Sequence, residues 1–171
     1  TAGTTYLNGG NLSVNIELQL LGGVLQGAGE IAGQITNAAV INPGSPIGIL
    51  NVAGDYAQGA TGTLQIDLGG TSPGTGFDQI NFTFGTVSLD GTLRVALTNG
   101  FLPNFGDSFR IMTFGSNTRT GNFKNFLGFD LGVTDRHLEA AYDVSGLTLV
   151  TRAGPLVIGG PTIQVTPFPP S

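Results

Sequence analysis

The chain of 171 residues contains no cysteine and no tryptophan, and lysine and arginine are absent from residues 1–93. Without cysteine the chain can form no disulfide, no thiolate nucleophile and no cysteine-ligated metal site. Nucleic acids and anionic membrane surfaces require a basic surface, which a chain with a net charge of −5 lacks. No apolar run approaches the ~18 residues of a membrane-spanning helix. We therefore predict no nucleic-acid partner and no transmembrane segment.

Glycine, in contrast, is abundant, with 29 residues, more than twice the usual ~7%. The glycines show no period of three, which excludes a collagen helix, and their number is incompatible with a coiled coil. Apolar residues make up 40% of the chain, which argues against disorder. The composition therefore indicates a folded domain that is rich in turns.

Apolar and polar residues alternate along several short segments, which is the pattern of half-buried β-strands. Each segment is bounded by Gly, Asn, Asp or Pro, the residues that turn a chain. The best helical candidate, residues 17–27, is interrupted by two glycines, each of which costs about 1 kcal/mol in a helix. The sequence therefore predicts an all-β protein. The clearest strands are residues 12–20, 63–68, 92–98 and 162–166.

One strand pattern occurs twice. Residues 62–68 read GTLQIDL, and residues 91–97 read GTLRVAL. Looser copies begin at Gly10 and Gly146. Repeated short strands at irregular spacing predict stacked strands with loops of variable length, in which each strand bonds to the copies above and below it.

A denser glycine pattern lies in residues 25–37, LQGAGEIAGQITN, and in residues 41–58, INPGSPIGILNVAGDYAQ. This pattern resembles the repeat at the end of autotransporter-type passenger β-helices, which also occurs in other bacterial surface and exported proteins. The resemblance covers roughly residues 22–151. It implies a right-handed parallel β-helix (a β-solenoid) that ends in a partly antiparallel β cap, and a location outside the cell or on the bacterial cell surface.

This interpretation divides the chain into four segments. We expect an N-terminal strand or cap in residues 1–21, β-solenoid rungs in residues 22–100 and a Phe-rich β cap in residues 101–151. Ten of the eleven phenylalanines lie between Phe77 and Phe129, which supports the position of the cap. Residues 152–171 are rich in proline and glycine. They form either a linker or a strand that pairs with another molecule.

The only histidine lies in a short acidic segment. On a strand, Asp135, His137 and Glu139 would share one face, and such a trio could hold a metal or form an acid–base pair. The simpler interpretation is a solvent face opposite Leu138 and Ala140. We adopt the simpler interpretation and predict no catalytic residue, no cofactor and no metal.

Three aspartates of residues 1–93 lie beside turn residues, and no calcium-loop motif is present in the sequence. We expect Asp55, Asp78 and Asp90 to accept hydrogen bonds from nearby backbone N–H groups.

The scarcity of reactive side chains favours a structural extracellular or cell-surface protein over an enzyme. Such a protein would serve as a stalk, an adhesin part or a self-assembling fibre subunit. The alternative is a carbohydrate-binding adhesin module, with a surface glycan as partner and Tyr6, Tyr56 and Tyr142 among the sugar-contacting groups. A polysaccharide-degrading β-helix enzyme has least support, because residues 1–93 lack the Arg and Lys that usually accompany its carboxylates.

Self-association is the expected mode of action, because open sheet edges and solenoid ends leave backbone N–H and C=O groups unpaired. Two segments have the alternation of a strand with one apolar face, one near each end of the chain. The assembly residues predicted on them are Leu12, Val14, Ile16, Leu18, Leu20, Ile163 and Val165.

Overall fold

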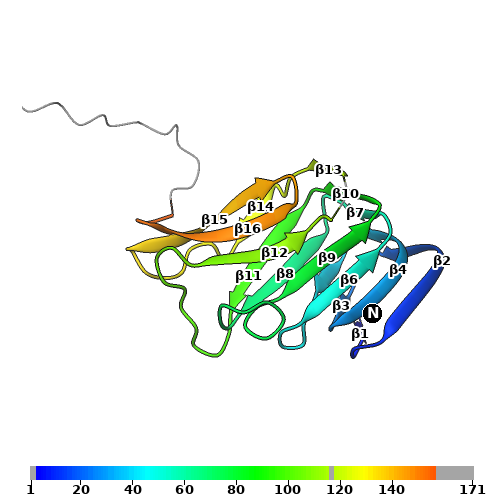
Figure 1. The fold of residues 1–171 in the computed structure, drawn as a ribbon, viewed down its shortest axis with the longest axis horizontal. Helices are drawn as coiled ribbons and strands as arrows, with labels where there is room; N and C mark the ends of the chain where they lie inside the picture. Colours follow the sequence, from blue (N-terminus) through cyan, green and yellow to red (C-terminus); the bar gives the residue numbers. More distant parts are fainter. Residues whose placement is uncertain (1–2, 116–117, 157–171) are drawn as a thin grey trace, which may run out of the picture.

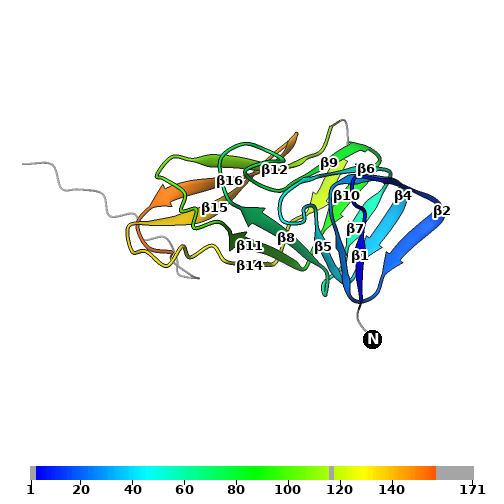
Figure 2. The same ribbon diagram turned by 90° about the horizontal axis from the view of Figure 1, so that it is seen from below.

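The computed structural model describes residues 3–115 and 118–156. Within these ranges the chain forms sixteen β-strands and no helix. The prediction of an all-β protein agrees with this. The strands gather in two sheets that face each other across the core, as two perpendicular views show (Figures 1 and 2).

The first sheet has six strands, which are all parallel, in the order β1-β3-β5-β8-β11-β14. Four of them are only three residues long, and three of these lie in the first third of the chain: β1 (Thr4–Tyr6), β3 (Val24–Gln26) and β5 (Val40–Asn42). The others are β8 (Thr63–Leu68), β11 (Thr92–Leu97) and β14 (Asn125–Leu127).

The second sheet has ten strands and mixes parallel with antiparallel pairs. Its main path runs β13-β10-β7-β4-β6-β9-β12-β16-β15, and β2 pairs with β4 beside this path. The antiparallel pairs are β12 with β16 and β16 with β15. The strands are β2 (Asn11–Leu20), β4 (Gly29–Asn37), β6 (Ile49–Ala53), β7 (Tyr56–Gln58), β9 (Gln79–Phe84), β10 (Thr86–Leu89), β12 (Ser108–Thr113), β13 (Thr118–Gly121), β15 (Arg136–Asp143) and β16 (Gly146–Ala153).

The prediction of a right-handed parallel β-helix was wrong, because the strands form one all-parallel sheet and one mixed sheet. For the same reason, residues 22–100 do not form the predicted β-solenoid rungs. Strand β4 shows the physical reason. Its first half pairs with β6 and its second half pairs with β7. On the same side, β4 therefore has two neighbouring strands, whereas a β-helix rung would pair with one strand of the next rung. Alternation in the sequence indicates which residues are buried, but it does not indicate how many strands pair with a given strand.

The repeated strand pattern produces neighbouring strands. The two copies are β8 and β11, which pair in parallel over their whole length, from Thr63 opposite Thr92 to Leu68 opposite Leu97. Leu64 therefore lies beside Leu93, and both are fully buried. Equivalent side chains stack in one register, which explains why the two segments share their apolar pattern.

The core lies between the two sheets and is rich in aromatic residues toward the middle of the chain. The rings of Tyr56 and Phe82 lie 5.0 Å apart between centroids, and those of Phe77 and Phe109 lie 5.5 Å apart, edge to face. Such pairs add about 0.5–1.5 kcal/mol to the burial of their area. The largest fully buried side chains are Tyr56, Phe82, Phe109, Phe114, Ile31, Ile35, Ile41, Leu50, Leu64, Ile66, Leu68 and Ile80.

The two ends of the molecule are formed by different strands. Strands β1 and β2 lie at one end, and β14 and β15 lie at the other (Figures 1 and 2). Each of β1, β13, β14 and β15 is a terminal strand of its sheet path, and β2 flanks β4. The ends of the molecule are therefore the places where another strand could be added.

Candidate functional site

The longest strand of the structure lies at one of these ends. Strand β2 spans ten residues and, within the described chain, pairs with β4 alone. An edge of this length presents a row of unpaired N–H and C=O groups, which is a template for pairing with another chain. We take the outer edge of β2 as the candidate functional site and name it the β2 edge.

Four predicted assembly residues of β2 share one environment. Leu12, Val14, Leu18 and Leu20 are half-buried and pack against the edge of the core. They are only partly covered because no further strand lies beyond β2 in the described chain. A neighbouring strand or sheet would remove the rest of their surface from water, at about 25 cal/mol for each Å² of apolar area.

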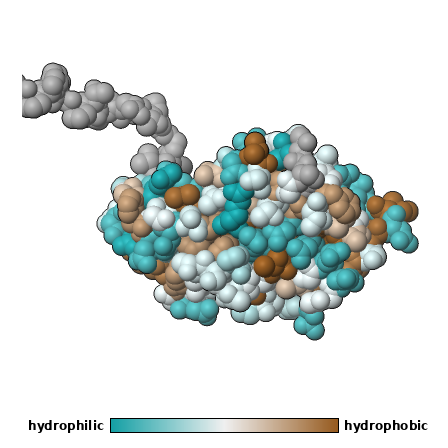
Figure 3. All heavy atoms as spheres, viewed as in Figure 1, coloured by the Kyte–Doolittle hydropathy of each residue, from teal (hydrophilic) through white to brown (hydrophobic). Residues whose placement is uncertain are grey.

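Ile16 lies differently from the other four residues. The pairing of β2 with β4 shifts register between Ser13 and Glu17, which is the mark of a β-bulge. The alternation of side chains breaks there, and Ile16 is 87% exposed. In Figure 3, hydrophobic atoms protrude at the end of the molecule where β2 lies.

The acidic group of β2 is held by its own sheet. The Glu17 carboxylate accepts hydrogen bonds from the Thr36 hydroxyl and from Gln19 Nε2, the latter at 2.7 Å. The hydrogen bond from Thr36, followed by that from Gln19, lowers the pKa of Glu17. The charge therefore has local partners and does not project freely from the β2 edge.

The two remaining predicted assembly residues, Ile163 and Val165, lie outside the described residues. The described chain ends at Leu156, so most of the predicted tail, residues 152–171, lies outside as well. Its first two residues belong to β16, which continues to Ala153.

The predicted acidic trio does not form one cluster. His137 is buried, with Nδ1 2.8 Å from the carbonyl oxygen of Gly154 and Nε2 3.4 Å from Glu139. Glu139 also accepts from Arg152 at 3.1 Å. Asp135 instead pairs with its neighbour Arg136 at 2.8 Å. Asp135 and Glu139 lie on the expected solvent face, but the expectation was wrong for His137, because the segment after β16 covers the imidazole.

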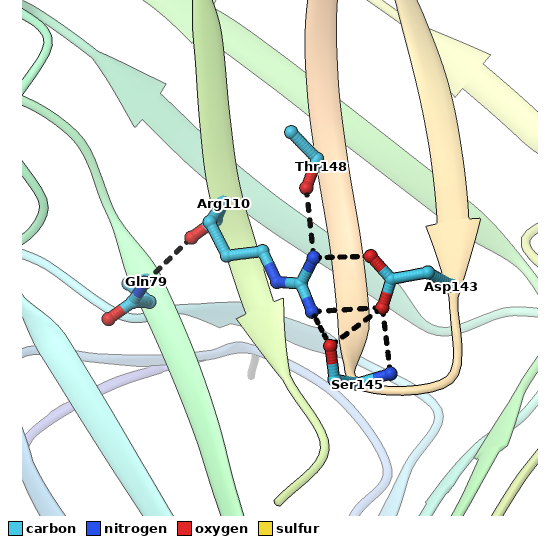
Figure 4. A network of polar contacts seen from close by, with 5 residues as sticks. All are labelled: Gln79, Arg110, Asp143, Ser145 and Thr148. Atoms are coloured by element: carbon cyan, nitrogen blue, oxygen red, sulfur yellow. Dashed lines mark hydrogen bonds and ion pairs between the residues drawn. The ribbon is translucent and has the colours of Figure 1, made fainter.

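A polar cluster around Arg110 was not predicted from the sequence (Figure 4). The guanidinium of Arg110 donates to both carboxylate oxygens of Asp143, at 2.6 and 3.0 Å, and also contacts Thr148 and Ser145. Arg110 lowers the pKa of Asp143 far below its ordinary value, and Ser145 adds to the effect. The cluster ties the turn between β15 and β16 to β12, over a separation of more than thirty residues. Only the Asp-x-Ser turn signal at Asp143 and Ser145 is visible in the sequence.

The three aspartates expected at turns all accept backbone hydrogen bonds. Asp90 accepts from the adjacent Gly91. Asp55 and Asp78 instead reach distant segments: Asp55 accepts from Thr86 N at 2.7 Å, and Asp78 accepts from Gly48 N at 2.8 Å. Two of the three therefore link strands and loops that are about thirty residues apart in the chain.

The tyrosines considered for sugar binding differ in exposure. Tyr56 is buried, with its hydroxyl donating to Gln58 at 2.7 Å, and burial raises its pKa. Tyr142 is half-buried beneath Arg119, whose guanidinium lies 4.7 Å from the ring centroid. Tyr6 is 61% exposed. One of the three tyrosines could therefore stack freely on a sugar ring.

No family model matches the chain, and a search of curated proteins finds no significant relative. The resemblance to autotransporter passenger repeats therefore stays a prediction. Among the described residues, no helix is long and apolar enough to cross a membrane. Residues 3–115 and 118–156 contain no group of three or more His, Asp or Glu side chains placed to hold a metal ion.

Proposed function

We propose that the chain is a structural β-protein of the bacterial cell surface or extracellular space, which associates with further copies of itself through open sheet edges. The observation that carries this proposal is the β2 edge, with ten residues of strand and one side free of any described strand. Strand addition at such an edge satisfies backbone groups and covers alternate side chains at the same time.

The apolar side of β2 supports the same conclusion. Leu12, Leu18 and Leu20 touch the core but stay half-exposed at the end of the sheet. Natural proteins usually blunt an exposed edge with charges, prolines or bulges. The β2 edge has one bulge and one carboxylate, Glu17, which bonds back to Thr36. These features leave most of the edge available to a partner.

The direction of the backbone groups identifies a residue for the test. The carbonyl of Gly10 accepts from Glu30 N at 3.1 Å, so Gly10 faces β4. In a parallel pair the backbone groups of alternate residues face the same neighbour. Leu12 therefore faces β4, and the N–H and C=O of Ser13 face outward.

The substitution Ser13→Pro should block association and leave the fold intact. Proline removes one outward donor and places its ring at the edge, without taking a hydrogen bond from the pair with β4. Light scattering after size exclusion, together with electron microscopy, should show assemblies for the natural chain and monomers for the variant.

The matched control is Ser13→Thr, which keeps the N–H and is favourable in a strand. It should assemble like the natural chain. A second variant, Ile16→Lys, adds a charge at an exposed position and should also weaken assembly. A natural chain that stays monomeric at millimolar concentration would contradict the proposal, as would a folded Ser13→Pro variant that assembles unchanged.

A further inference from the structure

An apolar groove lies at the end of the molecule opposite the β2 edge. Its volume is about 570 Å³, and it runs between β14 and β15. Phe126 and Leu127 of β14 are 41% and 53% exposed, although they are large apolar side chains. Leu138 and Phe129 form a buried floor, and the rings of Phe126 and Phe129 lie 5.0 Å apart. We name this feature the β14–β15 groove.

The backbone at the groove has capacity for a further strand. Strand β14 pairs with β11 on one side, and no described residue pairs with its other side. Strand β15 is the last strand of the second sheet, and its outer side is bonded at His137 and Leu138 to the segment Phe129–Asp130. Beyond Leu138, no described residue is paired with this outer side. An extended segment in the groove would therefore meet unpaired backbone groups as well as apolar side chains.

The described chain ends at the rim of this groove, because Leu156 is one of its lining residues. Residues 157–171 continue from there, so they start where the uncovered apolar surface lies. They contain no charged side chain, in keeping with an apolar groove that has charges only at Lys124 and Glu139. Their large apolar side chains are Val157, Ile158, Ile163, Val165 and Phe168.

We infer that the β14–β15 groove is the binding site of residues 157–171 of the same chain. Ile163 and Val165, which alternate with polar residues, lie against Phe126 and Leu127 in this arrangement. Gly159, Gly160 and Pro161 allow the turn that leads into the groove.

Binding of the tail to the groove of its own chain is favoured over binding to a second copy, because the tail is covalently attached beside its own groove. About seven residues separate Leu156 from Ile163, and they can span about 23 Å when extended. A segment tethered at the rim of its own site has an effective concentration in the millimolar range, which another copy reaches only in a dense assembly. The inference stands independently of the proposed self-association, which concerns the β2 edge.

The first experiment compares the natural chain with a chain that ends at Leu156, by amide NMR. Removal of residues 157–171 should shift the resonances of Phe126, Leu127 and Ala140 and leave those of β2 in place. A synthetic peptide of residues 157–171, added to the shortened chain, should restore the original resonances. Unchanged groove resonances after truncation would overturn the inference.

Two charge variants of the full chain test the residues that are in contact. The pair Ile163→Asp and Val165→Asp should give the spectrum of the shortened chain. The matched pair Thr162→Asp and Gln164→Asp adds the same charge on the other side of the segment and should leave the groove resonances in place. In the peptide assay, the first pair should weaken binding at least tenfold relative to the second. Equal effects of both pairs would contradict the assignment of side chains.

A mixing experiment separates the same chain from a second copy. Labelled shortened protein is mixed with unlabelled full-length protein at equal concentration. When each tail occupies its own groove, the labelled spectrum does not change. Restored groove resonances in the mixture would show that the tail binds another copy and would overturn the inference. Repeating the measurement in the Ser13→Pro background keeps this result separate from association at the β2 edge.

Discussion

At the scale of single residues, Asp78 is the acidic group with the most unusual surroundings. It is fully buried, Oδ1 accepts from Gly48 N at 2.8 Å, and Oδ2 accepts from Asp67 N at 2.9 Å. Burial raises the pKa of Asp78 to about 7, the charge of Asp67 adds to the rise, and the two backbone hydrogen bonds oppose it. The carboxyl group thereby joins the loop before β6 to the end of β8.

This surrounding predicts an unusual pH dependence of stability. The pKa of Asp78 is about 7 in the folded chain and 3.8 as its ordinary value, so the folded chain holds the proton more tightly. The contribution of Asp78 to the free energy of unfolding is therefore complete below about pH 4 and is lost as the pH rises through about 7.

The variant Asp78→Asn should be less stable than the natural chain by about 1–3 kcal/mol near pH 5, because an amide N–H₂ faces a backbone donor. The difference should shrink by pH 8, since the natural chain must then ionise a buried acid and the variant does not. Urea unfolding of both proteins at pH 5, 6.5 and 8 measures this difference, and contributions from the other carboxylates cancel in it. A difference that is constant over this range would refute the assignment.

At the scale of strands, the close approach of β14 to β11 depends on the residue that follows β14. Gly128 has φ of 75°, and a Cβ atom built on it would lie 1.9 Å from the carbonyl oxygen of Val95. Gly132 has nearly the same backbone conformation, with φ of 73°, but no atom lies within 4 Å of its Cβ position. A side chain added at Gly132 would therefore meet backbone strain alone, whereas one added at Gly128 would meet the same strain and a steric clash with Val95.

The substitution Gly132→Ala should cost about 1–2 kcal/mol, the cost of placing a side chain in a left-handed conformation. Gly128→Ala should cost more, because β14 must also move away from β11 and lose part of their pairing. Chemical denaturation of both variants gives the comparison. Equal losses would mean that the contact with Val95 relaxes without cost.

The bulge in β2 changes which of its side chains face the core. The alternating segment from Leu12 to Leu20 predicts one continuous apolar face, but the register shift between Ser13 and Glu17 turns Ile16 outward. A bulge arises from the pairing of two strands, so the sequence of one strand does not reveal it.

At the scale of the whole molecule, charge is distributed unevenly between the two ends. Residues 1–93 carry six acidic residues and no Lys or Arg, a charge of −6, whereas residues 94–171 carry five acidic and six basic residues, a charge of +1. The chain runs from the β2 end to the β14–β15 end (Figure 1). Two β2 ends therefore repel each other, and contact of the β2 edge with the less acidic half of another copy, outside the β14–β15 groove, is electrostatically favoured.

Association of the natural chain should accordingly weaken as salt rises, because screening removes this preference. Sedimentation at about 50 mM and about 500 mM NaCl measures the change. Between these concentrations the Debye length falls from above about 10 Å to below about 8 Å. The monomer variant Ser13→Pro serves as the control for nonspecific effects of salt. Association that strengthens with salt would instead indicate apolar contact between like ends.

The sequence by itself determined that the chain is built of β-strands and, where a strand is regular, which residues face the core. Leu64, Ile66 and Leu68 alternate with polar residues, and all three are fully buried in β8. Alternation is a local property that each segment carries independently. The repeat at residues 91–97 also correctly predicted a neighbouring copy, because equal apolar patterns can stack in register.

Only the tertiary structure decided the order of the strands, the two sheets and the surroundings of the polar groups. The prediction of a right-handed parallel β-helix was wrong because backbone hydrogen bonds form between any two strands, whatever their side chains. The sequence therefore does not show that one strand, β4, pairs with both β6 and β7. Arg110 meets Asp143, and the segment at Gly154 covers His137, only because β12, β15 and β16 fold together. Contacts between residues far apart in the chain depend on the packing of whole strands, and this is information that no short segment contains.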